Sequence, residues 1–138
     1  MPVIEELICT EQDGTISFGN YKLGQKAKKS DFEYQGDMYK VKTYNEITKL
    51  ERNDMFVYES VPGTAAEHFR VTDEGVEFTV EGSKDAQITV QLENDTDYEI
   101  YVNDSAVGNM MTNMSGKLSV SVELEEGISV PVKAFRRG

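Results

Sequence analysis

The chain has few of the residues on which most enzymes and metal sites depend. Its 138 residues include one cysteine, one histidine and no tryptophan. A single cysteine excludes an internal disulfide and any cysteine-based zinc site with the usual number of ligands. Cys9 lies among Ile4, Leu7 and Ile8, so we expect a small buried apolar side chain rather than a reactive thiol.

The lone histidine does not belong to a recognisable catalytic arrangement. His68 has no serine or cysteine beside it in the sequence that could act as a nucleophile. Phosphate-binding loops and a nucleophile elbow are also missing from the sequence. We therefore assign no catalytic residue and expect no cofactor. A carboxylate-dependent hydrolase remains a further alternative, but among 25 acidic residues no particular pair stands out.

Positive charge is scarce relative to negative charge. The 14 Lys and Arg residues face 25 Asp and Glu, which gives a net charge of −11. Such a charge repels phosphate backbones and anionic membranes, so neither nucleic acid nor a membrane is an expected partner. The first residues reach Glu5 and Glu6 before any apolar run develops. This pattern predicts no signal peptide and no spanning helix, and we expect a cytoplasmic protein.

What the sequence does have is alternation of apolar and polar residues. The clearest case is 118–124, where Leu, Val, Val and Leu alternate with Ser, Ser and Glu. The segments 88–92 and 98–102 repeat the pattern. About ten or eleven short strands with frequent turns predict an all-β fold, an antiparallel sandwich or barrel-like module built of hairpins with little helix.

Several local features of the sequence predict particular turns, loops and strands. Gly19-Asn20 predicts a tight hairpin turn, and 24–31, rich in lysine without a hydrophobic period, predicts a mobile loop. The stretch 45–52 fits either a helical turn or one arm of a hairpin. Pro131 lies inside the last apolar run, and because proline cannot donate to a ladder we expect an edge strand there.

The strongest break in the pattern is Val61-Pro62-Gly63-Thr64. It coincides with a change from aromatic, lysine-containing strands to aliphatic ones. We therefore predict an aromatic-rich hairpin region over residues 1–64 and a sandwich-like region over residues 65–138, with a single compact domain as the alternative.

Two groups of side chains are candidate binding sites. A metal site could use only hard oxygen ligands, and the densest cluster is one predicted turn, although it lacks the spacing and central glycine of a calcium loop. Its weak calcium candidates are Glu93, Asp95 and Asp97.

Aromatic residues of the first half could form a binding face, although strand propensity explains them as well. These residues are Tyr21, Tyr34, Tyr39, Tyr44 and Tyr58.

Several stretches carry a resemblance to known proteins. They are 36–44, 46–51, 55–64, 97–103 and 116–119. Together they resemble a group of short clostridial proteins that often carry the name endosialidase. That name implies a six-bladed propeller, an arginine triad and repeated Asp boxes, whereas 138 residues are about half of what such a propeller needs. The chain has only four arginines and no Asp box, so we transfer no catalytic residue.

The sequence therefore favours a non-enzymatic interaction or assembly module. Its expected partner is protein, and we expect self-association through an exposed sheet edge or the aromatic face of the first half. The alternative is a carbohydrate-binding sandwich module with a glycan or other small-molecule ligand.

Overall fold

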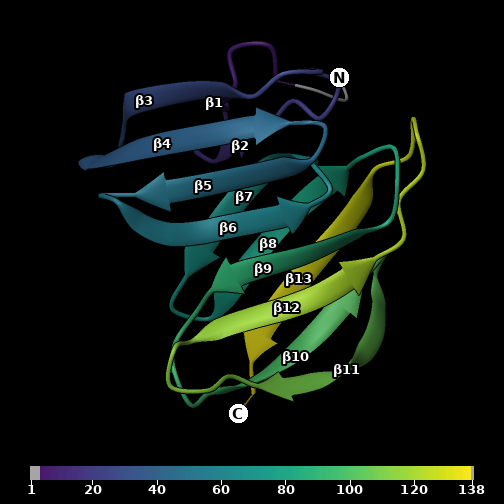
Figure 1. The fold of residues 1–138 in the computed structure, drawn as a ribbon. Coiled ribbons are helices and arrows are strands. Elements are labelled where there is room, and N and C mark those ends of the chain that lie inside the picture. The colour runs from purple at the N-terminus through teal and green to yellow at the C-terminus, as the bar shows by residue number, and fades with distance from the viewer. Residues whose placement is uncertain (1–3, 138) are drawn as a thin grey trace.

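The computed structural model describes residues 4–137, and these form two antiparallel sheets that pack face to face (Figure 1). No residue in that range is helical. The strands are β1 (Ile8–Thr10), β2 (Ile16–Phe18), β3 (Ala27–Tyr34), β4 (Asp37–Tyr44), β5 (Ile47–Arg52), β6 (Met55–Val61), β7 (Ala65–Thr72), β8 (Gly75–Glu81), β9 (Ala86–Gln91), β10 (Asp97–Val102), β11 (Ser105–Met111), β12 (Lys117–Val122) and β13 (Val130–Arg136). The predicted all-β fold is confirmed, and its form is a sandwich rather than a closed barrel.

The two sheets interleave the two halves of the chain. One sheet has seven strands in the order β1-β2-β7-β8-β13-β10-β11, and the other has six in the order β12-β9-β6-β5-β4-β3. Each sheet thus contains strands from both sides of residue 64. One buried cluster likewise draws on both halves, for example Val41 and Ile100. The predicted boundary at residue 64 does not separate two units. The Pro-Gly break marks the point where the chain leaves one sheet for the other.

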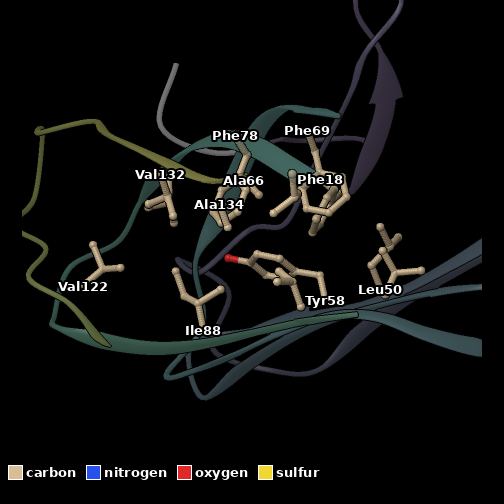
Figure 2. Packing of buried hydrophobic residues seen from close by; sticks show 14 of the residues in the cluster. Phe18, Leu50, Tyr58, Ala66, Phe69, Phe78, Ile88, Val122, Val132 and Ala134 are labelled. Atoms are coloured by element: carbon tan, nitrogen blue, oxygen red, sulfur yellow. The ribbon is translucent and has the colours of Figure 1, made fainter. Parts of the chain in front are cut away.

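Interlocking aromatic rings fill the middle of the core. Tyr58 on β6 of the six-stranded sheet meets Phe18, Phe69 and Phe78 of the seven-stranded sheet, with ring centroids 5.0, 5.9 and 5.6 Å away, all nearly edge to face. Figure 2 shows Tyr58 between the layers with the phenylalanines across from it. Edge-to-face pairs add to the free energy gained by burial, so this cluster ties the sheets together.

Buried hydroxyl groups fasten the crossing between the sheets. The Tyr58 hydroxyl lies 2.7 Å from Thr64 Oγ1, which also lies 2.8 Å from Ser60 Oγ. Thr48 Oγ1 donates to the Thr64 carbonyl at 2.8 Å and lies 2.8 Å from Thr43 Oγ1. All five side chains are buried, and unpaired hydroxyls at such depth would destabilise the fold. The network holds Thr64 in place where β6 ends and β7 begins.

Two local predictions in the first half are wrong. The segment 19–23 does not form the second arm of a hairpin, and β2 instead pairs with β1 and β7. Most of the predicted mobile loop, 27–31, belongs to β3. This strand lies at a sheet edge and buries none of its residues fully, so its sequence needs no apolar alternation. For 45–52, the hairpin alternative is correct because β5 and β6 are antiparallel neighbours.

Pro131 lies in a central strand, not in the predicted edge strand. Strand β13 pairs with β8 on one side and β10 on the other. The ladder with β10 ends at Val102–Val132, and the Pro131 carbonyl accepts from the Asn103 amide at 2.8 Å. The backbone N and C=O of a strand residue point toward the same neighbouring strand. The Pro131 nitrogen therefore points toward the β10 side, just beyond the last residue pair of the β10–β13 ladder, where a missing N–H costs no ladder bond. No bond to β8 is lost.

Candidate functional site

His68 makes contacts that do not match a catalytic triad. It lies on β7 with a left-handed backbone (φ 54°), and its Nδ1 lies 3.0 Å from Asp13 Oδ2 and 3.3 Å from Thr15 Oγ1. In a triad the acid and the nucleophile use different ring nitrogens, whereas both contacts here use the same one. Hydrogen bonds from the Thr15 hydroxyl and amide lower the pKa of Asp13 to about 2. We interpret Asp13 and Thr15 as part of a turn that is held by hydrogen bonds to the exposed His68.

Cys9 is half-buried rather than fully buried. Its Sγ lies 4.0 Å from Glu11 Oε2 on the outer side of β1. Burial, followed by the neighbouring Glu11 carboxylate, raises the pKa of the thiol. A raised pKa keeps the thiol protonated and therefore a poor nucleophile.

The weak calcium candidates do not come together as a site. In residues 4–137, no three His, Cys, Asp or Glu side chains are grouped so that they could hold a metal ion. Asp97 pairs with Arg137 at 3.6 Å between Oδ2 and Nη1, and Asp95 has the left-handed backbone of a turn residue. Glu93 contributes its amide to the Tyr98 hydroxyl at 3.1 Å. These residues serve the β9–β10 turn, where Asn and Asp are ordinary.

The five tyrosines of the first half do not form one exposed face. Tyr58 is fully buried in the core, and Tyr21 and Tyr39 are 3% and 7% exposed. Tyr21 donates to Glu126 on a loop, and burial raises the pKa of its hydroxyl to about 12. Only Tyr34 and Tyr44 are partly exposed, and they lie on different strands, β3 and β4. Alternation alone could not reveal this, because the same residue type occurs on both faces of the strands.

Two carboxyl groups lie near each other on the outer side of the seven-stranded sheet. In the β7–β8 register Glu67 lies diagonally across from Glu81, while their neighbours Ala66 and Val80 join the core. Burial, followed by the hydrogen bond and repulsion from Glu81, raises the pKa of Glu67 to about 7. The hydrolase alternative requires such a pair in a concave site. Neither carboxyl lines the hollows described below.

A hollow of about 380 Å³ opens between β2 and β7 of one sheet and β3, β4 and β5 of the other. Tyr34 and Tyr39 line it with ring centroids 5.6 Å apart, and Arg52 and Arg70 add positive charge. Its size falls within the range of roughly 300–1,000 Å³ typical of small-molecule sites. Sequence reasoning named the two tyrosines but missed the arginines, which lie 18 positions apart on β5 and β7.

Strand β11 is an edge with little protection, since its one irregularity is a bulge at Val107 in the pairing with β10. It ends the seven-stranded sheet, and all seven of its residues are exposed. Val107, Met110 and Met111 have 59%, 42% and 66% of their surface in contact with solvent. No side chain in the strand is charged. In Figure 1 β11 lies at the lower end of the molecule, away from β3.

The other three edges have the features that prevent edge pairing. β1 is only three residues long. β3 carries Lys28, Lys29, Asp31 and Glu33. β12 begins with Lys117 and turns its large apolar residues Leu118 and Val122 into the core. Short length, charge and inward apolar residues all discourage a further strand, and β11 has none of these.

An open groove runs beside β11. A hollow of about 510 Å³ lies between β10–β11 of one sheet and β12 of the other. Val102, Val107, Val122 and Val130 supply its apolar part. The two sheets therefore do not close over each other at this end, and apolar surface continues from the groove onto the β11 edge.

The chain matches no protein-family model, no curated protein and no solved structure. In the part of the chain from 4 to 137 there is also no helix of the length and apolar character needed to span a membrane. The geometry described above is therefore the basis for any functional assignment.

Proposed function

We propose that the protein is a non-enzymatic assembly module in which β11 pairs with β11 of a second copy. The observation that carries this is the uncharged edge strand, in which the valine, the methionines and every other residue are exposed. A free edge offers a row of backbone donors and acceptors, and addition of a strand satisfies them. Two seven-stranded sheets would then become one continuous sheet across the pair.

A second copy suits this edge better than a different protein for two reasons. A net charge of −11 makes copies repel over most of their surface, and β11 is a place where they can approach without like charges. A two-fold antiparallel pairing centred on Gly108 also sets small side chains opposite large ones. Ala106 then faces Met110 of the second copy, and Ser105 faces Met111, which gives a self-complementary surface.

Sedimentation velocity tests the proposal. We expect wild-type protein to form dimers at concentrations on the order of 10–100 μM, where a modest interface associates. Met111→Lys adds a charge to the edge and should leave only monomer. The matched control is Ser30→Lys, which adds the same charge to the exposed β3 edge and should leave the dimer intact. A wild-type monomer throughout, or a dimer indifferent to Met111→Lys, would contradict the proposal.

A second candidate function is glycan binding in the 380 Å³ hollow of Tyr34, Tyr39, Arg52 and Arg70. Aromatic faces and planar polar side chains together suit sugar rings and their hydroxyl or carboxylate groups. A glycan array followed by titration of any hit tests it, and Arg70→Ala should abolish the binding. A blank array would remove this candidate, and a hit unaffected by Arg70→Ala would place the binding elsewhere.

A further inference from the structure

A row of lysines crosses the outer face of the six-stranded sheet. In the register of β3, β4 and β5, Lys28 lies directly opposite Lys42, and Lys42 lies directly opposite Lys49. Like charges at directly opposite positions repel one another and weaken the pairing of strands. Alternation places these three side chains away from the core, because Val41 and Leu50 next to them are fully buried.

The positive charge of this row is only partly balanced. Glu51 Oε1 lies 3.2 Å from Lys40 Nζ, and Glu51 Oε2 lies 3.7 Å from Lys49 Nζ. Among the ion pairs of residues 4–137, none involves Lys28 or Lys42. The four lysines and one glutamate that line the hollow leave an excess of three positive charges there, in a chain whose net charge is −11. Glu59 on β6 lies directly opposite Lys49 and borders this row with one negative charge.

The patch is hollowed rather than flat. Its five side chains line a hollow of about 210 Å³. The lining residues are Lys28, Lys40, Lys42, Lys49 and Glu51. Lysine ammonium groups on flexible stems can converge on a compact anion from several strands at once. The hollow is smaller than the roughly 300 Å³ at which drug-sized ligand sites begin, so its occupant must be small.

We propose that this lysine hollow binds a small polyvalent oxyanion, of the phosphate or sulfate type. Such a group carries two or more negative charges and several strong acceptor oxygens in little volume. Its binding would relieve the repulsion along Lys28, Lys42 and Lys49. A monovalent carboxylate gains much less from the same excess charge, so charge density selects the ligand. The site lies on the opposite sheet from β11 and does not depend on self-association.

Titration of the 138-residue chain with inorganic pyrophosphate, followed by amide NMR shifts, tests the proposal. We expect saturable shifts confined to β3, β4 and β5, weaker shifts with sulfate and none with acetate. Lys42→Gln should weaken binding by roughly fivefold or more, the effect of losing one close charge. Glu51→Gln should tighten binding, since it removes the only negative charge in the hollow.

Lys117→Gln is the matched control. Lys117 also lies on the six-stranded sheet, but on β12, where its Nζ lies 4.6 Å from the centre of the Phe56 ring. Its loss should leave pyrophosphate affinity unchanged. Equal weakening by Lys42→Gln and Lys117→Gln would show only general charge attraction and would overturn the site. Shifts spread over both sheets, or no saturation at all, would do the same.

Discussion

The middle of the sandwich and its β11 edge treat apolar side chains differently. In the middle Phe18, Tyr58, Phe69 and Phe78 interlock between the sheets, and each is less than 5% exposed. At the β11 edge all seven residues of the strand are exposed beside an open groove. Burial in the middle stabilises the fold. The apolar surface at the β11 edge contributes little to folding and remains available to another chain.

The largest expected effect on stability comes from a substitution in the aromatic cluster at the middle of the sandwich. Tyr58→Ala empties the space among three phenylalanines and leaves the Thr64 hydroxyl without one partner. We expect the free energy of unfolding to fall by about 3–5 kcal/mol. Met111→Ala at the β11 edge should change it by no more than about 0.5 kcal/mol in monomer. Urea denaturation of both variants at low protein concentration checks the comparison, and equal losses would refute it.

Alternation in the sequence predicts a strand only where one face of that strand is buried. Alternation reveals β12, whose residues Leu118 and Val122 point into the core. It fails for β3, because an exposed and charged edge strand has no apolar face to reveal. The placement of Pro131 could not be predicted either, since it depends on where the β10 ladder ends.

The candidate β11 edge can be recognised in the sequence from its composition and not from alternation. Residues 105–116 contain no charged side chain, although 28% of the chain is charged, and this run holds three of the six methionines. The sequence analysis instead placed the expected binding face on the tyrosines of the first half. Burial of Tyr21, Tyr39 and Tyr58 removes most of that surface. Their burial follows from contacts between distant strands, which local patterns do not contain.

An effect of intermediate size is expected on the pH dependence of stability. It comes from Glu67 on the outer side of the seven-stranded sheet. The pKa of Glu67 is about 7 in the folded protein and lies near its ordinary value of 4.5 after unfolding. The folded state therefore keeps a proton that the unfolded state has already released, and this contribution to stability is lost as pH rises from about 4.5 to 7. Glu67→Gln should remove that loss and make the variant more stable than wild type at pH 8.

Glu77→Gln is the control for this pH dependence, because Glu77 lies on the neighbouring strand β8 and is paired with Arg70 instead of facing Glu81. Thermal unfolding between pH 4 and 9 should show the wild-type slope in Glu77→Gln and a flatter one in Glu67→Gln. An unchanged slope in Glu67→Gln would mean that the pKa of Glu67 is not raised in the folded protein.

Hydrogen exchange of backbone amides as a function of protein concentration tests the central claim most directly. If β11 pairs with β11 of a second copy, amides of Ser105–Met111 should exchange more slowly as concentration rises. Amides of the charged edge β3, Ala27–Tyr34, should exchange at the same rate throughout. Exchange of β11 that is independent of concentration, or protection that develops on β3 instead, would contradict the account.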